Sequence, residues 1–307
     1  MNAPLTIAIP VYNRADIVGK TLDSVAAQNV RPLKVVLVDN NSTDSSLAVL
    51  NHWADENRSE SLEIIVLQEH TPGAPAARNA ALAVIDTEWT MFFDSDDSMP
   101  RDHVEKALRT VVQNPHADIV GWGRRIHFLD GTVRRKEFAT ANPEYENLTQ
   151  SIFATQTYMA RTELFRRAGG WDNTIRVGQD IELGSRLLAL KPLLAKSPSQ
   201  YVDVYDSEVS ITNSTSRPMA SMKHTLDTIR HTLPGNRQHW VDLQMIIKAS
   251  SWGRNDPESA AMVDEIIART AARRRWLWKF FRWYQLHSGR GVARIYALLH
   301  LNRMRVR

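Results

Sequence analysis

The chain has 307 residues, of which 43% are hydrophobic, so it can bury a sizeable core. It contains no cysteine, which excludes a disulfide framework, a thiolate metal site and a thiol nucleophile. No run approaches the roughly 18 continuous apolar residues of a membrane-spanning helix, and the start, Met1-Asn2-Ala3-Pro4, has no basic leader. We therefore expect a globular, cytoplasmic protein that does not cross a bilayer.

The net charge of +4 hides an asymmetry along the chain. Residues 272–307 contain ten basic side chains and no acidic one, whereas the 28 basic and 34 acidic residues before them give a charge of −6. The sequence therefore predicts an acidic body with a strongly basic tail.

The first hundred residues alternate short apolar runs with helical patterns. Runs rich in branched side chains predict strands at 5–11, 34–39, 62–67 and 90–93, and helical spacing follows at 14–28, 42–57 and 76–85. Strands that alternate with helices are typical of a parallel sheet covered on both faces, so we predict an α/β fold.

The second half is less regular. After Pro100 we expect a helix to 113, a strand at 118–128 and, across an Asp130-Gly131 turn, another strand at 133–138. Further helices are expected at 146–153, 162–168 and 179–190, and further strands at 156–160, 193–196 and 201–205. From Pro218 onward only helical patterns remain. We therefore predict an α/β domain at 1–215, with halves at 1–100 and 101–215, and a helical region at 216–307.

The stretch 91–97, Met-Phe-Phe-Asp-Ser-Asp-Asp, brings three carboxylates to the end of a buried strand. Ligands in open α/β sheets bind outside the carboxyl ends of strands, and clustered carboxylates favour a divalent cation. Aspartate is also common in turns and helix caps, so the stretch alone leaves both interpretations open.

The junctions after the first three strands narrow the choice of ligand. The first, Pro10 to Arg14, lacks the glycines that a Rossmann dinucleotide site or a P-loop needs. The second, Asp39 to Asp44, could hydrogen-bond a base or ribose, although turn and capping chemistry explains Asn41 to Asp44 equally well. In the third, Arg78 stands alone among small residues, a placement that suits a phosphate or an ordinary surface arginine.

Taken in order, these motifs resemble those of the inverting nucleotide-sugar glycosyltransferases of family 2. I-P-V-Y-N-R, V-D-N-N-S-T-D, A-A-R-N-A-A-L and F-F-D-S-D-D stand in family order over residues 5–100, and later motifs extend the resemblance to about 214. The resemblance implies a GT-A fold, a Rossmann-like, mostly parallel sheet flanked by helices, here with a helical C-terminal extension.

The resemblance also implies roles for individual residues toward a nucleotide-sugar donor. Asp94-Ser95-Asp96 looks like the family's D-x-D motif, with Asp94 towards the ribose and Asp96 ligating Mn²⁺ or Mg²⁺. Such a cation stabilises the negative charge of the departing diphosphate. The donor-binding residues implied in this way are Pro10, Tyr12, Arg14, Asp39, Asn40, Arg78, Asp94, Ser95 and Asp96, and the metal ligands are Asp96 and Asp94.

Two later motifs concern the acceptor. Gly169-Gly170-Trp171-Asp172 and Gly178-Gln179-Asp180-Ile181-Glu182-Leu183 look like the family's G-G-[FW]-D and E-D-x-E-L motifs. Asp180 then stands where the family keeps its general base, and Trp171, Asp172 and Gln179 are expected to bind the acceptor. Without the resemblance, acidic residues in the first turn of a helix explain this segment.

The sequence departs from the family pattern in three places. Gln179 stands where many relatives have Glu, and Asn40 where many have a second Asp, so uridine is only the favoured base. The segment 205–212 resembles R-x-H-x-x-S-x-T without its Arg and His, which leaves Ser210 or Thr212 as weaker contacts to the leaving group.

The basic tail, residues 273–307, contains Arg-Arg-Arg-Trp-Leu-Trp-Lys-Phe-Phe-Arg-Trp-Tyr at 273–284. On a helix, Trp276, Phe280, Trp283 and Tyr284 share one stripe with cations beside it, which is typical of a helix at an anionic membrane surface. The alternative is a helix that packs its aromatic residues on the body. We do not expect nucleic-acid binding, because the body is acidic and no nucleic-acid motif is present.

The sequence therefore predicts a metal-dependent inverting glycosyltransferase that uses a nucleotide sugar, with a UDP-sugar favoured. The acceptor would be a glycan or lipid-linked hydroxyl in cell-surface glycan assembly at the inner face of the plasma membrane. Two alternatives stay open: a sugar-nucleotidyltransferase, for which the glycine-rich phosphate loop is missing, and a membrane-tethered protein that binds nucleotide without turnover.

Overall fold

The computed structural model describes residues 3–206, 219–252, 257–270, 272–287, 295–296 and 298–299. The chain forms two compact units, each made of several segments. The first comprises residues 1–143, 152–174 and 190–210, and the second comprises 144–151, 175–189 and 211–307.

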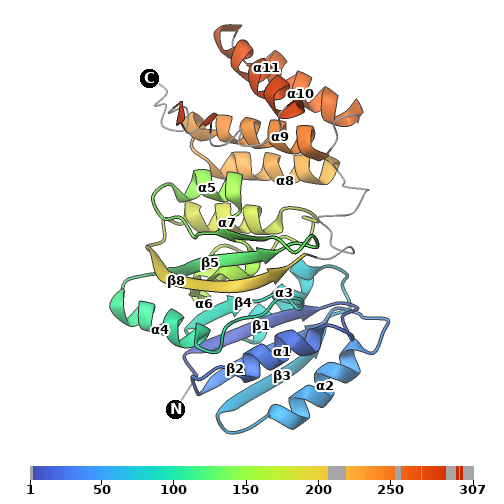
Figure 1. Cartoon of the computed structure of the whole chain (residues 1–307), viewed down its shortest axis with the longest axis vertical. Helices are drawn as coiled ribbons and strands as arrows, with labels where there is room; N and C mark the ends of the chain where they lie inside the picture. The colour runs from blue at the N-terminus through green and yellow to red at the C-terminus, as the bar shows by residue number, and fades with distance from the viewer. Residues whose placement is uncertain are drawn as a thin grey trace. The chain divides into compact units, whose positions relative to one another are not determined.

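The first unit is built on one mixed sheet of eight strands (Figure 1). The strand order is β3-β2-β1-β4-β7-β5-β6, and β8 pairs with β5. The strands are β1 (Leu5–Val11), β2 (Leu33–Asp39), β3 (Leu62–Gln68), β4 (Trp89–Phe92), β5 (Ile119–His127), β6 (Val133–Lys136), β7 (Tyr158–Arg161) and β8 (Leu194–Tyr205).

The first four strands pair in parallel, as the alternating pattern predicts. Every residue of β2 is buried, which explains its continuous run of branched side chains. The helices between them are α1 (Val18–Ala26), α2 (Ser46–Asn57) and α3 (Ala74–Val84). In Figure 1, α1 and α2 lie over one face of β1 to β3, where their apolar side chains share a core with β1 and β2. The predicted α/β class is confirmed.

The rest of the first unit extends the sheet on the far side of β4. Helix α4 (His103–Gln113) precedes β5, and β5 pairs with β6 across the Asp130-Gly131 turn, as predicted. Gln156 lies in the short helix η1 (Thr155–Thr157), so β7 begins later than expected, and α6 (Thr162–Arg167) follows it.

The strands predicted at 193–196 and 201–205 are one strand, β8, and that prediction was wrong. The register with β5 shifts between Gly121 and Gly123, which pair with Lys196 and Tyr201. Ser197 and Gln200 lie between these two pairs and are buried. Polar residues in a sequence suggest a loop, but here they are part of the strand.

The second unit is helical and has its own hydrophobic core. Its helices are α5 (Pro143–Gln150), α7 (Gln179–Ala189), α8 (Met219–Thr232), η2 (Gly235–Arg237), α9 (His239–Trp252), α10 (Pro257–Arg269) and α11 (Ala272–His287). Tyr145, Leu148 and Ile181 join the apolar cluster of α8 to α11. Helices α5 and α7 therefore belong to the helical unit although they lie before residue 215. The sequence analysis placed a single boundary between the two parts near residue 215, whereas the chain passes between the units several times.

No helix in the described part of the chain is long and apolar enough to cross a membrane.

Candidate active site

The loop after β1 is fixed by the loop after β2. Asn13 has a positive φ of 49°, and its side-chain oxygen accepts a hydrogen bond from the Thr43 backbone N–H at 2.8 Å. The backbone N–H of Arg14 donates to the Ser46 hydroxyl at 2.8 Å. Pro10 is half-buried at the end of β1, whereas the Tyr12 ring is 56% exposed and free to lie against a planar ligand.

Asp39 ends β2 as a buried carboxylate. One of its oxygens accepts a hydrogen bond from the Ser42 N–H at 3.2 Å. The other oxygen is buried and has no hydrogen-bond partner among the described residues. A buried acceptor without a donor is costly, so this oxygen is available to accept a hydrogen bond from water or from a ligand N–H or O–H.

The Asn40 amide binds the backbone of the loop after β3. Its nitrogen donates to the carbonyls of Glu69 at 3.0 Å and Thr71 at 2.7 Å, and its oxygen accepts from the Gly73 N–H at 2.7 Å. Because both ends of the amide are used, Asn40 positions the start of α3. A contact between Asn40 and the base stays a prediction.

Arg78, from α3, joins three motifs that are distant in the sequence. Its guanidinium donates to Asp94 at 2.9 Å, and the same group lies 4.4 Å from the centre of the Trp171 ring. Trp171 is only 3% exposed and packs edge-on against Phe92 of β4. The Trp171 ring therefore contacts protein on these sides, and its role toward an acceptor stays a prediction.

The D-x-D carboxylates follow β4 and face arginines. Asp94 and Asp96 are each about 30% exposed at the side chain, at 30% and 31%, and Asp96 lies 3.7 Å from Arg14. Ser95, between them, is buried. The structure thus brings Arg14, Arg78, Asp94 and Asp96 together at the carboxyl end of the sheet, and their role toward a donor phosphate stays a prediction.

The electrostatics of this loop disfavour its negative charges. Burial, followed by the charge of Asp94, raises the pKa of Asp96, although Arg14 opposes that shift. Burial and the charges of Asp94 and Asp96 raise the pKa of Asp97 well above its usual value. Asp97 accepts a hydrogen bond from the Tyr205 backbone N–H at 3.2 Å, so it ties the loop to β8.

No group of three or more His, Asp or Glu side chains that could hold a metal occurs among the described residues. Two half-exposed carboxylates still fit Mg²⁺ or Mn²⁺, because such ions bind through one or two carboxylates together with substrate phosphates. Asp94 and Asp96 are the residues that would hold the ion.

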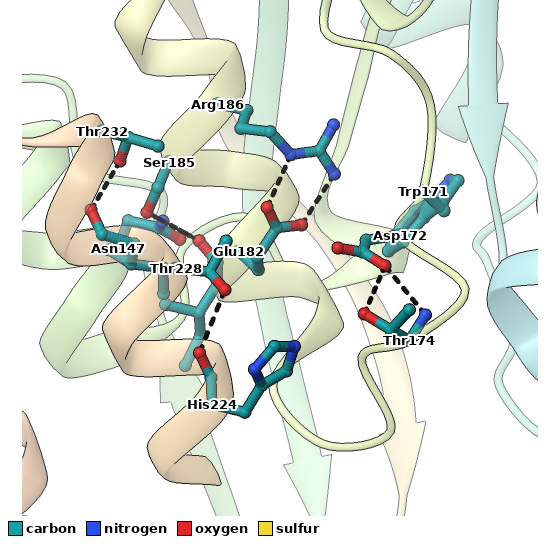
Figure 2. A network of polar contacts seen from close by, with 12 residues as sticks. Asn147, Trp171, Asp172, Thr174, Glu182, Ser185, Arg186, His224, Thr228 and Thr232 are labelled. Atoms are coloured by element: carbon teal, nitrogen blue, oxygen red, sulfur yellow. Dashed lines mark hydrogen bonds and ion pairs between the residues drawn. The ribbon is translucent and has the colours of Figure 1, made fainter. Parts of the chain in front are cut away.

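Asn79 fixes the Gly-Gly-Trp-Asp loop, a role that the sequence analysis missed. Its nitrogen donates to the Trp171 carbonyl at 2.8 Å, and its oxygen accepts from the Trp171 N–H at 2.8 Å. A Cβ on Gly170 would lie 2.6 Å from that oxygen, and Gly170 has a positive φ of 68°. Asp172 accepts hydrogen bonds from the N–H and hydroxyl of Thr174, as Figure 2 shows.

Gln179 and Asp180 lie in the second unit, at the start of α7. Both are half-buried, and Gln179 donates to the Arg176 carbonyl at 3.3 Å. Glu182, one turn further, is buried and forms two hydrogen bonds of 2.6 Å with Arg186 (Figure 2). Glu182 therefore has a structural role. Ser210 and Thr212 lie outside the described residues.

Comparison with protein families gives one match across half of the chain. A family model described as glycosyl transferase family 2 matches residues 6–169. The chain is 36% identical over 154 residues to a poly(ribitol-phosphate) beta-glucosyltransferase of Bacillus spizizenii, covering 49% of this chain and 24% of that protein. It is 21% identical over 254 residues to an uncharacterized glycosyltransferase of Haemophilus influenzae, covering 79% of this chain and 83% of that protein.

Solved structures extend the likeness to the whole chain. Residues 1–349 of TarS from Staphylococcus aureus, in complex with UDP-GlcNAc, match with a TM-score of 0.65 at 16% identity over 96% of this chain and 91% of that one. The mannosyltransferase PcManGT from Pyrobaculum calidifontis, with GDP-Man and Mn²⁺, matches with a TM-score of 0.63 at 17% identity over 98% and 88%. These matches confirm the predicted GT-A fold. Some curated relatives are much longer, and the chain covers 15% of one from Streptococcus pneumoniae.

Proposed function

Because the chain belongs to glycosyl transferase family 2, we propose that it transfers a sugar from a nucleotide-diphosphate donor to a hydroxyl of a glycan or lipid-linked acceptor in cell-surface polymer synthesis. The observation that carries the proposal is the arrangement of two carboxylates and two arginines, Asp94 with Arg78 and Asp96 with Arg14, at the carboxyl end of the parallel strands. Solved relatives that hold UDP-GlcNAc and GDP-Man support a nucleotide-sugar donor.

The donor base is proposed to be uracil. The unpartnered oxygen of Asp39 is an acceptor in a buried position, and the imide N–H of uracil is a donor of the required kind. The exposed Tyr12 ring offers a stacking surface near the end of β1. In thermal-shift measurements, UDP should therefore stabilise the protein more than CDP does, and Asp39→Asn should reduce that difference.

The diphosphate is proposed to bind between the arginines and the D-x-D carboxylates. Arg14 and Arg78 can each donate to phosphate oxygens. A divalent cation held by Asp94 and Asp96 would stabilise the charge that develops on the leaving diphosphate. We expect Mn²⁺ or Mg²⁺ to increase the thermal shift that UDP produces, and Asp96→Asn to remove that increase.

Asp180 is proposed as the general base of an inverting displacement. A carboxylate can take the proton of the acceptor hydroxyl as its oxygen attacks the sugar carbon. The support is the sequence motif around Asp180 and its half-buried place in the first turn of α7.

The decisive experiment compares three aspartate variants with the wild type. Asp96→Asn and Asp180→Asn should each abolish sugar transfer from a labelled donor to membrane extract, and Asp96→Asn should also weaken metal-dependent UDP binding. Asp23→Asn, on the exposed face of α1, is the matched control and should retain activity. Full activity in either site variant would refute the mechanism. A wild type that binds UDP and leaves the donor intact would favour a non-catalytic nucleotide-binding protein.

We also propose that α11 contacts an anionic membrane surface. Trp276, Phe280 and Trp283, which we call the aromatic stripe, are 65%, 39% and 56% exposed. On the opposite side of the helix, Trp278 and Phe281 are buried in the core of the second unit. Exposed aromatic rings beside cations such as the exposed Lys279 are typical of helices that lie at the lipid headgroup level.

A further inference from the structure

Trp171, which follows two glycines after α6, lies in the interior of the first unit. Only 3% of the residue is exposed, whereas Asn173 and Thr174, a few positions later, are both exposed. Its indole N–H is also buried and meets no hydrogen-bond acceptor among the described residues. A sugar stacks only on a ring face that it can reach, so the burial of Trp171 favours a role other than contact with an acceptor.

The backbone of Trp171 is fixed by Asn79 of α3. The amide nitrogen of Asn79 donates to the Trp171 carbonyl and the amide oxygen accepts from the Trp171 N–H, each at 2.8 Å. This close approach needs a glycine at position 170, where φ is 68° and a Cβ would lie 2.6 Å from the Asn79 oxygen. The residue that fixes the Trp171 backbone therefore follows Arg78 directly in the chain.

The Trp171 ring lies against Arg78 and against the strand that leads to the D-x-D loop. The Arg78 guanidinium is 4.4 Å from the centre of the ring. The ring also packs edge-on against Phe92, with 5.7 Å between the ring centres, and Phe92 ends β4 two residues before Asp94. Trp171 therefore contacts both elements that carry the ion pair of Arg78 and Asp94, whose atoms are 2.9 Å apart.

A ring against one face of an arginine restricts the orientation of the guanidinium. Tryptophan is the side chain whose ring attracts a cation most strongly, and the attraction grows when the pair is shielded from water. The Arg78 side chain is only 7% exposed, so this pair is largely shielded. The N–H donors of a guanidinium lie in its plane, so a ring on one face does not block them. Trp171 can therefore hold Arg78 in place without occupying the N–H groups that meet an anion.

We propose that Trp171 is a positioning residue for the donor, which holds the Arg78 guanidinium where the diphosphate of the nucleotide sugar binds. The inference rests on the proposed sugar transfer, in which Arg78 donates to that diphosphate. It gives the ring of the Gly-Gly-Trp-Asp motif a role on the donor side, in place of the acceptor contact that the family resemblance implies. An arginine that is already ordered loses less conformational freedom when a phosphate binds, and the saving appears as affinity.

The test is a double-mutant cycle on the full chain, in which calorimetry with Mg²⁺ present measures the dissociation constants of UDP and uridine. Trp171→Leu should weaken UDP binding roughly two- to tenfold, which is the cost of ordering one arginine side chain. Uridine lacks the diphosphate, so its binding should equal that of the wild type. In an Arg78→Gln background the same Trp171→Leu change should have no effect on UDP binding, because the cation that the ring positions is absent.

Two further variants separate this role from a loss of folding. Trp171→Phe keeps a packed ring without the indole N–H, should lose less UDP affinity than Trp171→Leu, and completes the same cycle if Trp171→Leu does not fold. Trp89 is 2% exposed and forms the same kind of pair with Arg161, at 5.0 Å, at the start of β4. Trp89→Leu is therefore the matched control and should retain wild-type UDP binding.

Three results would overturn the inference. Weakened UDP binding in Trp89→Leu, or weakened uridine binding in Trp171→Leu, would show a general loss of structure. An undiminished effect of Trp171→Leu in the Arg78→Gln background would show that the ring does not act through Arg78. Unchanged UDP binding in Trp171→Leu would remove the donor role, and reduced sugar transfer to membrane extract in that variant would assign Trp171 to the acceptor.

Failure of the proposed function is read separately. If the wild type binds no UDP, or if Arg78→Gln leaves UDP binding unchanged, the proposed diphosphate site fails and the inference fails with it. If Arg78→Gln weakens UDP binding and Trp171→Leu does not, the proposed site stands and only the inference about Trp171 fails.

Discussion

Substitution of His103 tests how the interior of the first unit controls stability at low pH. His103 starts α4, has no exposed surface and packs edge-on against Trp122. The Gln200 amide nitrogen donates to both Nδ1 and the backbone carbonyl of His103, each at 2.9 Å. A carbonyl can only accept, so the amide orientation is fixed and Nδ1 must accept as well. A proton on Nδ1 would break this contact.

Burial lowers the pKa of His103 from 6.5 to about 3, and the nearby charges of Asp102 and Lys106 act on it in opposite directions. Because the pKa is depressed in the folded state, the unfolded chain binds the extra proton. Stability is therefore fully present above pH 6.5 and falls as the pH drops towards 3. Between pH 7.5 and pH 5 the loss is about 2 kcal/mol, roughly thirtyfold in the unfolding equilibrium.

The variant His103→Asn removes this titration, so its free energy of unfolding should change about 2 kcal/mol less between the two pH values than that of the wild type. The measurement is urea unfolding read by pulsed hydrogen exchange of peptides from β5 and α4, which follows the first unit. Any loss of packing against Trp122 cancels, because each protein is compared with itself. His116→Asn, at an exposed position, controls for removal of an imidazole. An unchanged pH dependence in His103→Asn would refute the reasoning.

Three further predictions concern the Gly-Gly-Trp-Asp loop after α6, the second unit and α11. Asn79→Asp should raise the KM for the nucleotide sugar roughly tenfold, because a carboxylate cannot donate to the Trp171 carbonyl, and initial-rate kinetics would show it. Glu182→Gln should destabilise the second unit by roughly 1–3 kcal/mol in urea unfolding, since the buried carboxylate charge opposite Arg186 is lost and an amide can accept only one of its two hydrogen bonds. Replacing the aromatic stripe by serine should reduce co-sedimentation with anionic vesicles, without changing the UDP thermal shift.

Much of the fold could be predicted because the strands of the first half are buried on both faces. A buried parallel strand requires a continuous run of branched residues, and β1 and β2 show it directly in the sequence. The single strand β8 could not be predicted, because the buried Ser197 and Gln200 belong to an irregular register that depends on contacts with β5 and α4. Helices were expected near α5 and α7, but their place in the second unit could not be predicted, because their partners in its core are far away in the chain.

The sequence motifs predicted which residues make up the candidate site, but they did not predict which of these residues contact each other. The motifs predict which carboxylates and arginines are expected at the donor site, but the pairing of Arg14 with Asp96 and of Arg78 with Asp94 depends on tertiary contacts. Asn79 carried one signal that the sequence analysis did not use. Asparagine competes with the helix backbone for hydrogen bonds, so its presence within α3 suggests a bond outside the helix.

The asparagines of the three junctions differ from the charged residues in what they can do. An amide both donates and accepts, so Asn40 and Asn79 can each hold the N–H and the carbonyl groups of a neighbouring loop. A carboxylate only accepts and a guanidinium only donates, so neither could replace these amides. Among the charged residues, Asp97 also holds a backbone N–H, that of Tyr205, whereas Asp39 keeps one buried oxygen without a partner among the described residues. We therefore expect the two asparagines to position loops and Asp39 to accept a hydrogen bond from the donor.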